Sequence, residues 1–168
     1  MGCADRLGSA LPGGASTKEL EDAFIAKNVL FYIERSNNSN AVIYEANTAD
    51  GAFVKGDPVK VYWIMYAKSP VNEEGLNMVE RNTAYGHTCT ENADGSYDLV
   101  LAALKTKKIK LSIDGDGVMH AVTQINNVDA ELSKIYVENT TSWGMPKVKY
   151  IDLKGKAEGK DIEERINN

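Results

Sequence analysis

The chain has 168 residues and a formal net charge of −5, with 43% hydrophobic and 26% charged residues. These values are typical of a globular domain, so they exclude a disordered, collagen-like or coiled-coil protein. The negative net charge also argues against a nucleic-acid-binding protein, because such a domain is normally strongly basic.

Two cysteines, Cys3 and Cys89, are too few for a disulfide framework and match no zinc-binding spacing. We therefore expect a reducing, cytoplasmic location. No apolar run reaches the roughly 18 residues of a membrane-spanning helix, and the N-terminus lacks the apolar region of a signal peptide.

Residues 1–15 are small and show no periodicity, which predicts a flexible tail before a single β-rich domain over residues 16–168. The tail begins Met-Gly-Cys, in which Gly2 is an acceptor for myristoylation and Cys3 an acceptor for palmitoylation. This start resembles that of dually acylated peripheral membrane proteins, which implies anchoring at the cytoplasmic face of a membrane. Arg6 stands where the motif has Ser or Thr, so an unmodified tail is the alternative.

The first predicted element of the domain is a helix that begins at Ser16, where Glu19 completes a capping box. From Asn28 onward the hydrophobic period changes from 3.6 to 2. Residues 29–35 and 41–46 then read as two strands of a hairpin, joined by a Ser/Asn-rich turn.

Residues 59–67 form the longest alternating strand. Because strand side chains alternate between faces, one face is predicted to lie in the core and consists of Val59, Val61, Trp63, Met65 and Ala67. The other face suits a second cavity or a half-covered surface, and it consists of Lys60, Tyr62, Ile64 and Tyr66.

After an acidic turn over residues 72–75, residues 76–85 predict a second short helix, and residues 161–166 an edge strand or short helix. Further strands, separated by turn residues, are predicted over residues 87–91, 97–104, 109–113, 118–125, 132–138 and 148–153. The pattern predicts an all-β fold with two short helices, either an antiparallel β-sandwich or a flattened β-barrel of about eight to nine strands.

One polar cluster is the candidate ligand-binding site, with Arg35 and His120 as further neighbours, and its residues are Tyr62, Tyr66, Glu80, Arg81, Tyr85 and His87. A strand with two phenols opposite a helix that carries Glu-Arg and ends in Tyr-Gly-His can form a pocket with convergent polar groups. The alternative is a packed surface rim, in which the charges pair locally and the tyrosines fill a small satellite core.

The sequence contains no motif that is typical of a catalytic site or a metal site. His87 and Cys89 offer two ligands from one strand, but no second pair lies nearby. The turn at Asp114 lacks oxygen ligands at Val118 and Ile125, where a calcium loop needs them. Nucleophile elbows and phosphate-binding glycine loops are also absent, so we predict no catalytic residue, no metal and no cofactor.

Four segments carry a resemblance to a known family. They are LFYIERS at residues 30–36, VIYEAN at 42–47, VYWI at 61–64 and ERNTAYG at 80–86. With them the chain resembles an uncharacterised domain-of-unknown-function family of small single-domain proteins, over about residues 28–166. The resemblance implies a shared fold and brings no established activity.

These observations favour a non-enzymatic binding or scaffold module, tethered to a membrane through its N-terminus, whose partner is an unidentified protein or small molecule. The rival hypothesis is a small-molecule carrier or small enzyme that uses a pocket near Tyr62, Glu80 and His87. A third is a structural subunit that assembles through an exposed sheet edge.

Overall fold

The computed structural model of the protein describes residues 28–36, 38–65, 72–82 and 85–167. Almost all of this part of the chain is strand, and its only helix, α3 (Met78–Asn82), has five residues. The all-β class is therefore confirmed. The predicted tail over residues 1–15, the helix from Ser16 and the end of the central strand beyond Met65 lie outside the described residues.

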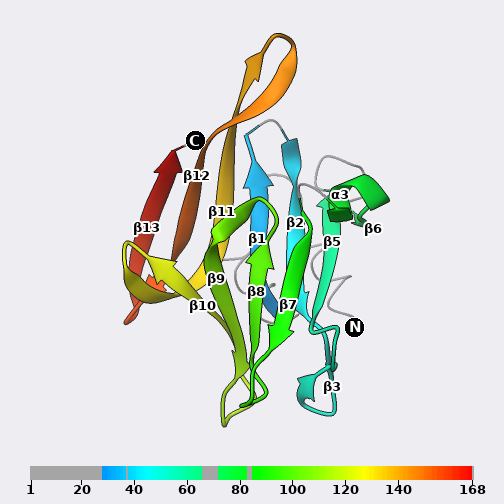
Figure 1. The fold of residues 1–168 in the computed structure, drawn as a ribbon, viewed down its shortest axis with the longest axis vertical. Coiled ribbons are helices and arrows are strands. Elements are labelled where there is room, and N and C mark those ends of the chain that lie inside the picture. The colour runs from blue at the N-terminus through cyan, green and yellow to red at the C-terminus, as the bar shows by residue number, and fades with distance from the viewer. Residues whose placement is uncertain (1–27, 37, 66–71, 83–84, 168) are drawn as a thin grey trace.

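Eleven strands form one sheet with the order β6-β5-β2-β1-β11-β10-β9-β8-β7, from which β12 and β13 continue beside β11 (Figure 1). Two short strands, β3 (Thr48–Ala49) and β4 (Ala52–Phe53), pair separately. The strands of the large sheet are β1 (Val29–Arg35), β2 (Asn38–Ala46), β5 (Val59–Met65), β6 (Asn72–Gly75), β7 (His87–Glu91), β8 (Tyr97–Leu101), β9 (Leu104–Ile113), β10 (Met119–Ile125), β11 (Val128–Ser142), β12 (Met145–Ala157) and β13 (Lys160–Asn167).

The fifteen-residue strand β11 joins the two halves of the sheet, which are β6-β5-β2-β1 on one side and β10-β9-β8-β7 on the other. Its residues 128–131 pair with β10, residues 134–137 pair with β1, and β12 lies along the opposite edge. Because β1 and β10 leave the same edge of β11 one after the other, the two halves curl to face each other as a half-barrel (Figure 1). Every pairing in the sheet is antiparallel among the described strands except that of β1 with β11, which is parallel.

Two local predictions differ from the observed elements. Residues 72–75, predicted as a turn, form strand β6, in which Glu74 pairs with Trp63. Asn and Glu have low strand propensity, but the outer edge of β5 offers backbone groups that need partners. Among the described residues, the predicted helix over residues 76–85 is shortened to α3. Residues 161–166, predicted as an edge strand or a short helix, lie in the edge strand β13.

The hydrophobic core lies between the two facing halves. Its fully buried side chains from both halves include Phe31, Val42, Tyr44, Leu99, Ile109 and Leu111. On β5, Val59 and Trp63 belong to this core, as their alternation predicted. Ile64, on the opposite face of β5, is also buried at 1% exposure, so both faces of this strand are covered there.

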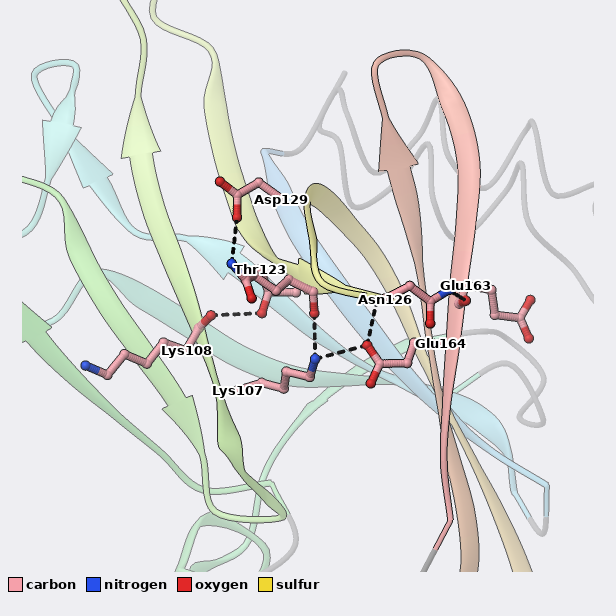
Figure 2. Close-up of polar contacts among 8 residues, drawn as sticks. Lys107, Lys108, Thr123, Asn126, Asp129, Glu163 and Glu164 are labelled. Carbon is pink, nitrogen blue, oxygen red and sulfur yellow. Dashed lines mark hydrogen bonds and ion pairs between the residues drawn. The ribbon is translucent and has the colours of Figure 1, made fainter.

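Polar contacts tie the last strand, β13, to the turn between β10 and β11 (Figure 2). Lys107 Nζ donates to the Gln124 carbonyl oxygen at 2.8 Å and to Glu164 Oε1 at 3.0 Å. The Asn126 N–H donates to the same Glu164 oxygen at 2.7 Å. The Asn126 N–H and the Lys107 ammonium lower the pKa of Glu164, so this carboxylate is charged at neutral pH. It holds β13 against β9 and the turn between β10 and β11.

Candidate functional site

The short helix α3 is held in place by the side chain of Glu80. The Glu80 N–H donates to Asn77 Oδ1 at 2.8 Å, and the Asn77 N–H donates to Glu80 Oε1 at 2.9 Å, which is a reciprocal N-terminal cap. Trp63 Nε1 of β5 also donates to this carboxylate, with both oxygens at 3.2 Å. Glu80 therefore fastens α3 to β5.

Tyr85 forms a fixed wall between α3 and β7. Its ring stands edge-on to Trp63 with 5.2 Å between the ring centres. Arg35 Nε donates to the Tyr85 hydroxyl at 2.6 Å, and the Tyr44 hydroxyl donates to the Tyr85 carbonyl oxygen at 2.9 Å. Burial raises the pKa of Tyr85, against the opposing effect of Arg35, so the phenol remains protonated.

A cavity of about 370 Å³ opens beside Tyr85, between β5, α3 and β7. We call it the Arg81 pocket. Its apolar lining residues are Val59, Val61 and Leu76, and Tyr85 and Gly86 complete its wall. Its charged or ionisable lining residues are Asp57, Lys60, Arg81 and His87.

Arg81 supplies the positive charge of the Arg81 pocket at neutral pH. Arg81 Nε donates to the Leu76 carbonyl oxygen at 3.1 Å, which fixes the exposed side chain and leaves its planar end as a donor group. Burial lowers the pKa of His87 and Asp57 only partly counteracts this, so the imidazole is neutral at pH 7. Arg81 is then the cation of the pocket and Asp57 its anion, because the Lys60 ammonium lies on the opposite face of β5, 4.0 Å from Glu45 Oε2.

The structure brings together half of the predicted site residues, namely Arg81, Tyr85 and His87. Glu80 lies beside the pocket and is engaged by Trp63. Tyr62 lies on the opposite face of β5, where its hydroxyl donates to Glu45 Oε1 at 2.7 Å. Tyr66 lies outside the described residues.

Of the two proposed neighbours, Arg35 contacts Tyr85, whereas His120 belongs to a separate cluster on β10. His120 lies between two carboxylates, with Nε2 at 2.7 Å from Asp114 Oδ2 and Nδ1 in contact with Glu131 Oε1. The hydrogen bond to Asp114 and the neighbouring Glu131 raise the pKa of His120. The two histidines of the chain therefore have opposite electrostatic environments.

We expect His87 and His120 to titrate on opposite sides of pH 6.5, the ordinary value for histidine. His120 should add stability that is complete below pH 6.5 and is lost as the pH rises through its raised folded-state pKa. The protein should lose stability as the pH falls below 6.5, because protonating His87 costs more free energy in its buried position than in the unfolded chain. NMR titration of the protons on the two imidazole Cε1 atoms, assigned with the variant His87→Gln, measures both pKa values. Equal pKa values for His87 and His120 would contradict the prediction that their electrostatic environments differ.

Sequence reasoning missed part of the pocket lining. Asp57 precedes the central strand and is not among the predicted site residues. Asp57 enters the Arg81 pocket because residues 57–61 lie beside His87. No sequence pattern predicts that Asp57 lies near His87, because this contact depends on how the two halves of the sheet face each other.

A second cavity, of about 480 Å³, lies where β1 and β10 diverge from β11, and we call it the Met119 cleft. Its lining is mostly apolar and includes Leu30, Phe31, Met119, Ala121 and Leu132. Periodicity placed these residues on strands but gave no indication of a space between them. The cleft suits an apolar group, whereas the Arg81 pocket suits a polar one.

The described part of the protein is thus an all-β half-barrel with a polar, ligand-sized pocket beside its short helix. The chain belongs to the family described as domain of unknown function DUF4833, which it matches over residues 31–165. The expected membership of an uncharacterised family is therefore confirmed.

No curated protein matches the chain. No solved structure matches it either. Within the described ranges, no helix is long and apolar enough to cross a membrane. In the same part of the chain, no group of three or more His, Cys, Asp or Glu side chains is placed to hold a metal ion.

Proposed function

We propose that this protein is a non-enzymatic binding module and that the Arg81 pocket holds a small-molecule ligand. The observation that carries the proposal is the cavity of about 370 Å³, to which Arg81, Tyr85 and His87 all contribute. Small-molecule sites commonly measure about 300 to 1,000 Å³. A cavity of this size supports a pocket over the alternative of a packed rim.

The ligand that fits best is a small organic acid. Its carboxylate would pair with the Arg81 guanidinium, whose planar donors match a carboxylate. Its apolar part would lie on Val59, Val61 and Leu76. Neutral His87 would supply one further hydrogen bond.

The chemistry around the pocket supports binding over catalysis. Glu80, the nearest carboxylate on α3, already accepts hydrogen bonds from Trp63 and Asn77. Burial raises the pKa of the Cys89 thiol to about 11, so it is not a thiolate at neutral pH.

The proposal includes a cytoplasmic location at a membrane face, through acylation of Gly2 and Cys3. Its support is the Met-Gly-Cys sequence, because both residues lie outside the described part of the chain. Intact-mass measurement of the protein from its native cells tests it, and a mass without an acyl group would contradict it.

The ligand proposal is tested by NMR titration with benzoate and hexanoate, with benzamide and hexanamide as neutral probes of the same shape. We expect the acids, but not the amides, to shift the signals of His87 and Tyr85. Arg81→Met keeps most of the side-chain stem and removes the charge, so it should weaken acid binding about tenfold or more, as expected for a lost charge-assisted hydrogen bond.

Two variants serve as controls. Lys105→Met removes an exposed charge from β9 and should leave acid binding unchanged. Met119→Trp fills the Met119 cleft and should also have no effect on binding. Equal binding of acids and amides, or unaltered binding to Arg81→Met, would contradict the proposal. Loss of binding in Met119→Trp alone would place the ligand in the cleft.

A further inference from the structure

The hairpin formed by β11 and β12 extends beyond the rest of the sheet, as the orange projection in Figure 1 shows. The ladder of β1 with β11 ends at Val137, and that of β12 with β13 ends at Tyr150. Beyond them, four cross-strand pairs from Asn139 with Val148 to Ser142 with Met145 lead to the turn. At about 3.3 Å per residue, the tip lies roughly 13 Å further out.

The tip of this hairpin is apolar and exposed. Trp143 is fully exposed, and Met145 is 70% exposed. The turn residues Trp143 and Gly144 both have left-handed backbone conformations, with φ of 53° and 78°. Tight hairpin turns of this kind favour Asn, Asp and Gly, so neither the turn nor the core accounts for a tryptophan here.

Other tight turns of the protein make the contrast clear. Consecutive left-handed residues also occur in turns that carry polar side chains at the first position, namely Asp50-Gly51, Asn126-Asn127 and Glu158-Gly159. Among these turns of the described chain, only the one at the projecting tip carries a large apolar side chain. Its position therefore suits a contact with something outside the molecule.

The charge around the tip identifies the chemistry of that contact. Lys147 and Lys149 are exposed on the β12 arm. Residues 139–151 contain no acidic residue, although the whole chain has a net charge of −5. The hairpin is thus a cationic projection with an apolar end on an acidic protein, which is complementary to a surface that combines negative charge with an apolar layer just beneath.

We propose that the hairpin tip docks onto an anionic phospholipid bilayer. Trp143 and Met145 enter the interface between headgroups and acyl chains, where tryptophan is enriched, and Lys147 and Lys149 contact the anionic headgroups. A convex tip needs no shaped receptor in a fluid bilayer. Only the turn enters, because the outer edges of the two arms carry backbone groups that must stay hydrated. This docking is independent of the Arg81 pocket and of acylation at Gly2 or Cys3.

The test uses the full-length chain produced without acyltransferases and vesicles of phosphatidylcholine alone or mixed in equal parts with phosphatidylserine. We expect binding to the mixed vesicles with a blue shift of tryptophan emission, which reports Trp143 because Trp63 is already buried. Trp143→Ser should lower vesicle partitioning about tenfold or more. The double variant Lys147→Glu and Lys149→Glu should lower it by about thirtyfold or more.

Matched variants separate the hairpin from general surface effects. Val118→Ser removes an exposed apolar side chain at a different turn, and Lys105→Glu with Lys160→Glu makes the same charge change elsewhere. Both controls should bind vesicles like the wild type, and circular dichroism should show all variants folded. The proposal is overturned if the wild type ignores the mixed vesicles, if Trp143→Ser binds normally, or if the two charge variants lose binding equally.

Discussion

Replacing Gly155 with alanine is expected to destabilise the protein by about 3 kcal/mol or more, although it adds a single methyl group. A Cβ atom at this position would lie 2.1 Å from the Glu131 carbonyl oxygen and 3.1 Å from Ile125 Cδ1. The oxygen belongs to the backbone of β11, so it cannot turn aside like a side chain. Strand β12 would have to move away where Glu131 pairs with both β10 and β12.

Gly115→Ala is the matched control for this substitution. Gly115 has no heavy atom within 4 Å of an added Cβ and no left-handed backbone conformation. Its replacement should change the free energy of unfolding by less than about 0.5 kcal/mol. Urea unfolding of the two variants measures the difference, and similar midpoints would show that the strands tolerate a side chain at Gly155.

The second large effect is expected at Tyr44, which joins the two halves of the sheet. Its side chain is fully buried, its ring is stacked on Phe31 at 4.6 Å between centres, and His87 of β7 lies edge-on at 6.1 Å. Tyr44→Ala should cost about 4 kcal/mol, because it leaves a cavity of aromatic size. Tyr44→Phe should cost about 1 to 2 kcal/mol, because it removes the hydrogen bond to the buried Tyr85 carbonyl oxygen.

Tyr150→Phe provides the comparison for the loss of a hydroxyl. The Tyr150 hydroxyl makes only a long contact of 3.5 Å with Glu138 and is half-buried, so the change should cost less than about 0.5 kcal/mol. Thermal or urea unfolding gives the ranking of the three variants. If Tyr44→Phe were no more harmful than Tyr150→Phe, the buried hydrogen bond to Tyr85 would have no role in joining the two halves.

The all-β class was predictable because its signals are local. The alternation over Val59–Met65 correctly separates Val59 and Trp63 in the core from Lys60 at the surface. Pairings between distant segments were not predictable. Strand β6 forms only because the edge of β5 is available, and the parallel pairing of β1 with β11 joins segments far apart in the chain. Turn residues carry no information about either contact.

The same distinction explains the candidate site. Arg81, Tyr85 and His87 are neighbours in the sequence, so a short helix followed by a strand was enough to group them. Tyr62 was grouped with them by proximity in the sequence, yet its face of β5 points away from the pocket. Asp57 joins the site across the space between the two halves, which no periodicity encodes.

The position of β11 in the sheet also sets the order in which the protein can be completed during synthesis. The strands β7 to β10 connect by short turns and can assemble as each leaves the ribosome, whereas β1 waits for β11, whose residues 134–137 are made about a hundred positions later. Until then one edge of β1 has no partner among the described strands, and an open strand edge can pair with other nascent chains. The arrival of β11 therefore covers this edge of β1 and joins the two halves of the sheet.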